Sequence, residues 1–237
     1  MIKVRVGDVH YEGRPIGLSG GTLTLLSRDG QLLFLPENKV RDYRQSAPRF
    51  APYDSGRMRA DLYKELGNNY EVTGTGHYLV AHPRGQQNLW AQRFEDLYRS
   101  FYHYFQVRGF RLREPQFPLV AIVFPSRAEF YAHSAKLNIP VSRNTLGFYS
   151  RNTNRIYLYD TTNGAKGQDW AQNASTIIHE ATHQSAFNTG VHSRFTETPR
   201  WASEGLAMMF EAPGVYEGGS YRPQKDRVNA ERSADFR

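Results

Sequence analysis

Three residues in the second half of the chain have the types and spacing of a metal site. His179, Glu180 and His183 form the pattern H-E-x-x-H. Imidazoles four residues apart on a helix project from one face about one turn apart, so His179 and His183 can converge on a single ion. Glu180 is displaced around the helix, where its carboxylate can reach a metal-bound water. The pattern therefore predicts a zinc site with Glu180 as the catalytic base.

The residues around this motif are typical of a helix packed in a core. Ile177, Ile178 and Ala181 make the segment apolar, Asp169 can cap its start, and Gly190 can end it in a left-handed conformation. The same five-residue pattern also occurs by chance on solvated helices. The apolar surroundings count against that alternative, because buried paired histidines need a partner.

A catalytic zinc site with three protein ligands needs one more donor. The chain has no cysteine, so thiolate ligands and disulfides are excluded. A third histidine of the metzincin kind would lie six residues after His183, where the chain has Thr189. That subclass is therefore excluded, and the remaining downstream candidates are His192, Glu197, Glu204 and Glu211.

A second helix is predicted over residues 199–212, because a Thr-Pro pair opens this segment and a Pro-Gly pair closes it. On this helix Trp201, Glu204, Met208 and Glu211 follow at intervals of 3, 4 and 3 and share one face. A carboxylate between Trp201 and Met208 would be desolvated unless a cation meets it. We therefore expect Glu204 to be the third zinc ligand. A glutamate that is partly exposed or paired with arginine is the alternative.

The two motifs together resemble the paired-helix active site of gluzincin peptidases. They are His179-Glu180-x-x-His183-Gln184 and Pro199-x-Trp201-x-x-Glu204-Gly205-x-Ala207. The chain is most similar to a bacterial gluzincin-like family described only as a domain of unknown function, over about residues 118–212. The resemblance implies one zinc ion, completed by the glutamate of the second helix, and hydrolysis of a peptide or protein substrate by a metal-activated water. It also implies a substrate backbone that pairs with the strand at residues 147–150.

One departure from the family concerns the support of the zinc histidines. Thermolysin-like enzymes have an acidic residue four positions after the glutamate ligand, where this chain has Met208. Glu211 or Asp160 is expected to supply that contact instead. Donors to the oxyanion of the reaction are sought near the site in sequence, and the candidates are His192, Tyr216 and Tyr221.

The elements that must position these residues predict an α+β protein of two units. Residues 1–43 are expected to form a small all-β, barrel-like domain, because apolar residues alternate between glycine turns. Residues 44–57 are expected to be a linker. Residues 58–237 are expected to form a zincin-like catalytic domain with a mixed sheet and paired active-site helices. The polar C-terminal segment suggests that this domain is cut short.

Within the larger unit the pattern predicts helices and strands in alternation. Strands are expected at 70–81, 119–124 and 147–160, the first and last of them as hairpins, and short helices at 58–66 and after Ser126. A long helix is expected to end at Gly109. Its stripe of apolar residues is predicted to be core: Trp90, Phe94, Leu97, Phe101 and Phe105.

The net charge of +7, from 30 Lys and Arg against 23 Asp and Glu, favours anionic surroundings. The basic residues are scattered, so nucleic-acid binding is an unfavoured alternative. A second alternative is a catalytically idle zinc-binding module that organises a surface for envelope polymers or a protein partner. No transmembrane segment is predicted. An exported or periplasmic location is favoured only if a signal peptide has been removed, and the sequence does not predict the oligomeric state.

Overall fold

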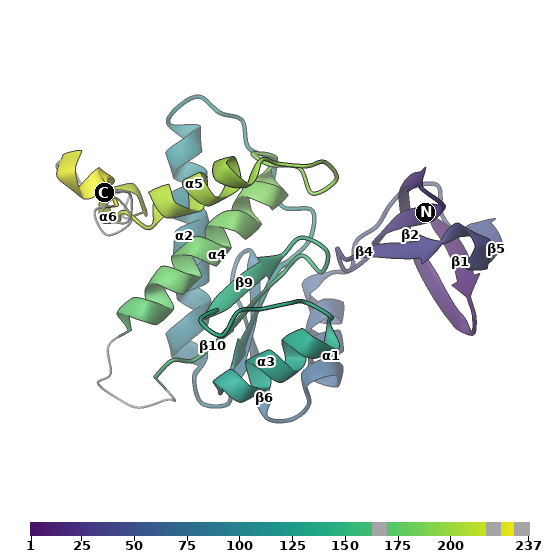
Figure 1. The fold of residues 1–237 in the computed structure, drawn as a ribbon, viewed down its shortest axis with the longest axis horizontal. Coiled ribbons are helices and arrows are strands. Elements are labelled where there is room, and N and C mark those ends of the chain that lie inside the picture. Colours follow the sequence, from purple (N-terminus) through teal and green to yellow (C-terminus); the bar gives the residue numbers. More distant parts are fainter. Residues whose placement is uncertain (163–169, 217–223, 230–237) are drawn as a thin grey trace.

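The computed structural model describes residues 1–162, 170–216 and 224–229. In these ranges the chain forms two five-stranded sheets and six α-helices, so the expected mixture of helices and strands is confirmed. The sheet of residues 2–45 lies to one side of the larger helix-covered sheet (Figure 1).

The first sheet is open, and the expected barrel is wrong. Its strand order is β4-β3-β2-β1-β5, so β4 and β5 are unpaired edges in residues 1–45, all of which are described. Val40–Gln45 contributes no buried side chain, because the sequence VRDYRQ lacks an apolar face that could line a barrel interior. The five strands are β1 Ile2–Val6, β2 Val9–Ser19, β3 Thr22–Ser27, β4 Leu32–Pro36 and β5 Val40–Gln45.

The second sheet is mixed, as expected, with the order β6-β7-β8-β10-β9. The central pairs β7–β8 and β8–β10 are parallel, whereas β6 and β9 are antiparallel edge strands. A parallel pair needs a crossover connection, which the long helix α2 provides between β7 and β8. The strands are β6 Tyr70–Gly74, β7 Tyr78–Pro83, β8 Leu119–Phe124, β9 Gly147–Ser150 and β10 Arg155–Tyr159.

Helices cover both faces of this sheet. Along β8 the side chains alternate, so Leu119 and Ala121 face one core and Val120 and Ile122 face the other. Leu119 and Ala121 pack under α2 and α4, and Val120 and Ile122 pack under α1 and α3. The four helices are α1 Ser55–Leu66, α2 Gln87–Gln106, α3 Arg127–Lys136 and α4 Ala171–Thr189.

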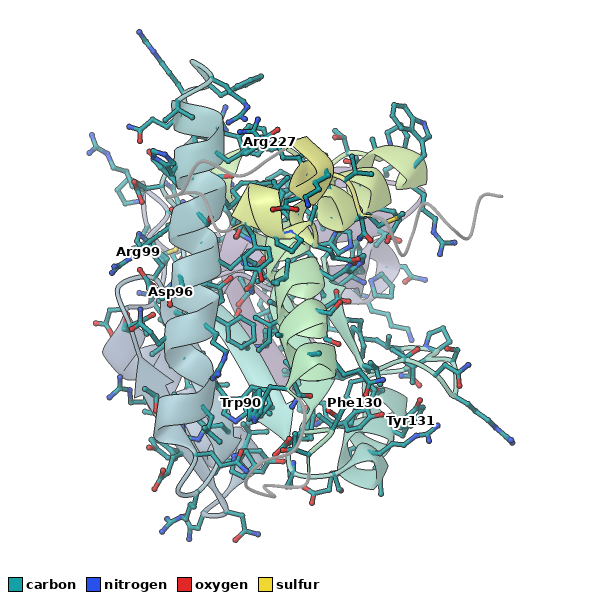
Figure 2. The ribbon with its side chains drawn as sticks, turned by 90° about the vertical axis from the view of Figure 1, so that its left-hand side faces the viewer. Trp90, Asp96, Arg99, Phe130, Tyr131 and Arg227 are labelled. Atoms are coloured by element: carbon teal, nitrogen blue, oxygen red, sulfur yellow. The ribbon has the colours of Figure 1, made fainter. Side chains whose placement is uncertain are left out.

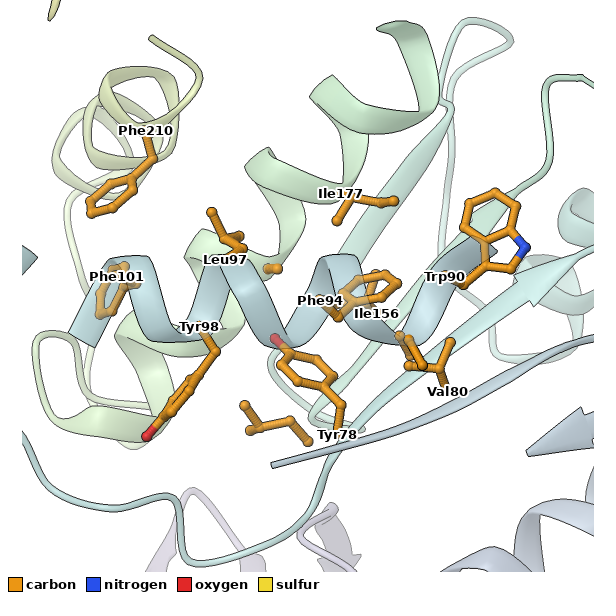
Figure 3. Close-up of a cluster of buried hydrophobic side chains, with 14 of the residues drawn as sticks. Tyr78, Val80, Trp90, Phe94, Leu97, Tyr98, Phe101, Ile156, Ile177 and Phe210 are labelled. Carbon is orange, nitrogen blue, oxygen red and sulfur yellow. The ribbon is translucent and has the colours of Figure 1, made fainter. Parts of the chain in front are cut away.

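The aromatic stripe of α2 forms the centre of the larger core, as predicted. All five of its residues are buried. Figure 3 shows Phe94 and Leu97 of this stripe between the sheet and Ile177 of α4, with Phe210 of the following helix at one end. Figure 2 shows Asp96 and Arg99 on the opposite, outer side of α2. This core fixes α4 against the sheet.

Three shorter helices follow α4: α5 Arg200–Phe210, α6 Pro213–Tyr216 and the 3-10 turn Gln224–Arg227. The expected helix at 199–212 is confirmed with shorter ends. Pro199 flanks α5 rather than opening it, and no side chain caps this end. Within the described ranges no helix has the length and apolar character needed to cross a lipid bilayer.

Candidate metal centre

The helix α4 brings His179 and His183 together. Their Nε2 atoms are 3.2 Å apart, with the rings edge to face. Ile177 and Ala181 are buried beneath them, and Gly190 ends the helix at a φ of 92°, as predicted. Two imidazole nitrogens this close repel each other unless a proton or a cation lies between them. The pair is therefore arranged to share a positive charge.

Glu204 of α5 provides the third ligand atom. Its Oε2 lies 3.3 Å from Nε2 of His179 and 3.7 Å from Nε2 of His183. A tetrahedral ion with ligand bonds of about 2.0–2.1 Å holds its ligands roughly 3.3–3.4 Å apart. The three observed separations fit one such ion. His179, His183 and Glu204 thus form a group that can hold a metal ion.

Glu204 is not enclosed between two apolar side chains, and this part of the sequence argument is wrong. Trp201 is 80% exposed, and the Glu204 side chain is 39% exposed. A helix turns about 100° per residue, so Trp201 lies opposite Phe210, which is buried with Ala207. Glu204 therefore lies at the margin of the buried face, and the two histidines rather than Trp201 determine its surroundings.

Glu211 supports the first histidine. Its Oε1 lies 2.7 Å from Nδ1 of His179, and its side chain is only 8% exposed. A hydrogen bond donated by Nδ1 leaves the lone pair of Nε2 directed at the ion site. Asn229 donates to the other carboxylate oxygen at 2.8 Å and to the carbonyl of Met208 at 3.2 Å. Sequence reasoning missed Asn229, because no motif connects it with the two helices.

Glu180 lies against the edge strand β9. Its Oε2 accepts the backbone N–H of Tyr149 at 2.7 Å. Burial raises the pKa of Glu180, and the neighbouring histidines oppose this rise. Gly147 allows the close approach of β9 to α4, since a Cβ there would lie 2.8 Å from Thr176. A cavity of about 230 Å³ next to these residues is also lined by His179 and Glu211.

The charges of the site favour a cation. Burial lowers the pKa of His179, but hydrogen bonds to Glu204 and Glu211 outweigh this effect and raise the pKa to about 10. Hydrogen bonds from His179 and His183 lower the pKa of Glu204 well below its usual range. Glu204 therefore keeps its negative charge, and the hydrogen bonds to the two glutamates favour a proton on His179 when no other cation is bound.

The remaining candidates lie apart from the three ligands. Asp160 is buried near the start of α4, where it accepts hydrogen bonds from Thr162 and Asn173. Tyr216 lines a cavity of about 370 Å³ with Leu97 and Ile177, between α2 and α4. Its carbonyl accepts a hydrogen bond from Ser100. Tyr221 lies outside the described residues.

His192 follows α4 on a loop and does not belong to the metal-binding group. Its ring centroid is 5.2 Å from that of Phe187. Its Nε2 is shielded from solvent and has no hydrogen-bond partner among the described residues. Burial lowers its pKa, and so does the nearby His183. Both effects favour the neutral imidazole, and His192 lies on the loop that follows α4 rather than beside the ligand atoms.

A polar network that the sequence did not reveal holds α4 to the β9–β10 hairpin. The Tyr149 hydroxyl donates to Asn154 at 2.8 Å, and the amides of Asn154 and Asn188 bond to each other. Gln184 donates to the carbonyls of Val120 and Asn154. Asn154 has a φ of 59°, a left-handed turn conformation that asparagine tolerates. This turn was predicted, but its contacts with the helix were not.

The comparisons with known proteins concern the same part of the chain. Residues 173–237 match the family described as "Protein of unknown function (DUF1570)". The match includes α4 from residue 173 onward, all of α5 and the three candidate ligands. No curated protein matches the chain. The expected likeness to a family of unknown function is thus found over the C-terminal part, and the description of that family names no activity.

Proposed function

We propose that this protein is a zinc-dependent peptidase of the gluzincin type. The observation that carries the proposal is the placement of Glu180 beside His179, His183 and Glu204, with its carboxylate fixed by a backbone amide of strand β9. A purely structural metal site needs ligands alone. General-base chemistry also needs a carboxylate beside the ion, and Glu180 of α4 is such a group, held in place by its hydrogen bond to the edge strand β9.

Zinc is the metal that best fits the donors. Two imidazole nitrogens and one carboxylate oxygen, with no cysteine in the chain, match the ligand set of catalytic zinc sites that keep a fourth position open. The group has separations close to those of a tetrahedral ion, and Glu211 orients His179 as a carboxylate commonly does at zinc.

A bound zinc ion would supply a Lewis acid that lowers the pKa of a water molecule at the open position. Glu180 would then accept a proton from this water and deliver it to the leaving amine nitrogen. The bond from Tyr149 holds Oε2, and Oε1 accepts no hydrogen bond from the described residues, so it is free for the proton. Burial raises the pKa of Glu180 toward the range in which a carboxylate serves as both base and acid.

The fold around the site supports a zincin-like assignment. The edge strand β9 runs antiparallel to β10 and packs beside α4, and α5 adds a glutamate to the two histidines. An edge strand can pair with the backbone of an extended peptide, which tolerates many side chains. We therefore expect a peptide to lie along β9, across Glu180.

The test combines metal analysis with peptide cleavage. Elemental mass spectrometry should find about one zinc per wild-type chain, and Glu204→Ala should lose most of it. Glu180→Gln should keep the zinc and lose cleavage of a peptide library by at least about a hundredfold. Glu197→Ala, at an exposed glutamate upstream of α5, is the matched control and should change neither.

Two results would contradict the proposal. A wild-type chain that takes up no zinc would exclude the metal site. Full activity in Glu180→Gln would exclude the assigned base. Zinc binding without any peptide cleavage by wild type would instead favour the idle zinc-binding module.

A further inference from the structure

A third cavity, separate from the metal centre, lies where the N-terminal sheet meets the end of α4. Its volume is about 760 Å³. One wall comes from strands β2 and β3 of the first sheet, another from the segment that precedes β8, and a third from residues 187–195 at the end of α4. Neither the three candidate ligands nor Glu180 lines it. It is therefore a distinct feature of the molecule.

The charge of this cavity is strongly unbalanced. The residues that line it include three arginines, Arg14, Arg113 and Arg194, but only one acidic residue, Glu114. Glu114 lies 3.6 Å from Nε2 of His77 and accepts a hydrogen bond from the Tyr98 hydroxyl, so its carboxylate contacts these two side chains. The cavity lining thus carries three arginines and one carboxylate, and none of the three arginines is within ion-pair distance of a carboxylate among the described residues.

Arg194 is the most unusual of the three because it is only 6% exposed. It donates to the carbonyls of Gly30 and Arg151 at 2.7 Å, which joins the first sheet to the β9–β10 turn. These carbonyls fix the guanidinium but do not neutralise it. A buried arginine is normally paired with an anion, because an unpaired buried charge is costly. A positive charge held in one position in this way is typical of a preformed anion-binding site.

Arg14, on strand β2 of the first sheet, also has a guanidinium group that is held in place but not paired with a carboxylate. Its Nε is shielded from solvent and finds no hydrogen-bond partner among the described residues. Its guanidinium carbon lies 5.4 Å from the ring centroid of Phe50, which holds the side chain in place. Arg113 lies on the other wall, in van der Waals distance of the position that a Cβ on Gly190 would occupy. Arginines from three separate segments therefore line the cavity.

The cavity begins close to the metal centre. Phe187, which lines it, lies four residues after His183, or about 6 Å along the helix axis. The ring of Phe187 stacks on that of Tyr149 with centroids 5.8 Å apart, and the N–H of Tyr149 binds Glu180. A chain lying along β9 past Glu180 is thus directed toward the arginines.

We propose that this cavity binds an anionic group of the substrate, a carboxylate or a phosphate, and so selects acidic chains for the metal centre. This proposal rests on the proposed peptidase function for the source of the ligand. It gives the N-terminal sheet a part in recognition, because Arg14 and the carbonyl partner of Arg194 belong to it. Arginine suits this role, since its planar fork binds carboxylate and phosphate with two parallel hydrogen bonds.

The first experiment measures anion binding without any catalysis. Glutarate and inorganic phosphate are titrated by calorimetry into the chain of residues 1–237 at 0.15 M ionic strength, roughly physiological. Wild type should bind at least one of them, and Arg113→Gln and Arg14→Gln should each weaken that binding roughly tenfold. Arg111→Gln removes an exposed arginine that does not line the cavity and should have no effect. Comparing the two probes distinguishes a carboxylate site from a phosphate site.

The second experiment measures selection. Glu180→Gln protein is titrated with matched peptides that carry glutamate, glutamine or phosphoserine at one position in turn. The anionic peptides should bind about tenfold more tightly than the glutamine peptide, and Arg113→Gln should remove the difference. Arg194 is left unchanged, because its hydrogen bonds to two carbonyls hold the two sheets together.

The outcomes separate this inference from the proposed function. A wild-type chain that binds neither probe, or variants at Arg113 and Arg14 that bind as wild type does, would overturn the anion site. A chain that cleaves neutral and acidic peptides equally would keep the peptidase function and overturn the selection. A chain that binds glutarate or phosphate but cleaves no peptide would keep the anion site and reject the peptidase.

Discussion

Glu211 accepts a hydrogen bond from Nδ1 of His179 at 2.7 Å, although His179 lies on α4 and Glu211 directly follows α5, 32 positions further along the chain. The contact joins α5 to α4 through the metal site itself. It also fixes the tautomer of His179, because a histidine that donates from Nδ1 presents its Nε2 lone pair to the ion. The orientation of the first ligand therefore depends on the residue that directly follows α5.

Replacing this support should weaken metal binding without removing a ligand. We expect Glu211→Ala to lower zinc affinity roughly 10–100-fold, which is the usual effect of losing a carboxylate behind a metal-bound histidine. Competition with a fluorescent chelator measures the affinity. Glu197→Ala is the control for loss of a carboxylate elsewhere. An unchanged affinity in Glu211→Ala would mean that His179 is oriented by the helix alone.

Metal binding should release a proton at neutral pH. The pKa of His179 is raised to about 10 in the metal-free site, so its imidazole is protonated below that pH and the proton must leave when a metal binds. Apparent affinity should therefore rise with pH, by about tenfold per unit between roughly pH 7 and 9. Calorimetry in two buffers with different ionisation enthalpies counts the protons. A buffer-independent binding enthalpy at pH 7.5 would show that His179 is already neutral.

The local part of the site could be predicted from the sequence, and the long-range part could not. The spacing of His179 and His183 on one helix determines their separation, because helix geometry is fixed. The contact of Glu180 with Tyr149 depends instead on how β9 packs against α4. Asn229 lies beyond two further helical elements, so no spacing rule connects it with Glu211.

In the fold, too, the local elements could be predicted from the sequence, whereas the way the N-terminal strands assemble could not. Residues with strong periodicity, such as the α2 stripe and the alternating strand β8, were assigned correctly because one face of each must be buried. The N-terminal unit was predicted to be a small barrel or curled sheet because its apolar residues alternate between glycine turns. The sheet stays open because strand β5 is polar and has no apolar face to line a barrel. The composition of β5 was therefore a better guide to the fold than the spacing of the turns.

The close approach of β9 to α4 can be tested at Gly147. A Cβ at this position would lie 2.8 Å from Thr176 and 2.9 Å from Leu158, so Gly147→Ala should lower the free energy of unfolding by about 1–3 kcal/mol. Gly205→Ala is the matched control, because nothing lies within 4 Å and alanine is the better helix former. That variant should be stabilised by up to about 1 kcal/mol.

Urea denaturation of both glycine variants measures these free energies. The opposite signs of the two changes make the comparison independent of a general effect of alanine. A Gly147→Ala protein as stable as wild type would show that β9 can move away from α4 at no cost. Such freedom would also be expected to loosen the bond between Tyr149 and Glu180.

The exposed position of Trp201 leads to a prediction opposite to the one that the sequence favoured. If Trp201 desolvated Glu204, its removal would weaken both folding and metal binding. Because its side chain is 80% exposed, we expect Trp201→Ala to change the free energy of unfolding by less than about 0.5 kcal/mol and to leave the zinc content unchanged. Phe210→Ala, on the buried face of the same helix, should cost about 3–5 kcal/mol. Denaturation and elemental analysis of the two variants decide which face of α5 packs on the core, and equal losses of stability would contradict the observed orientation.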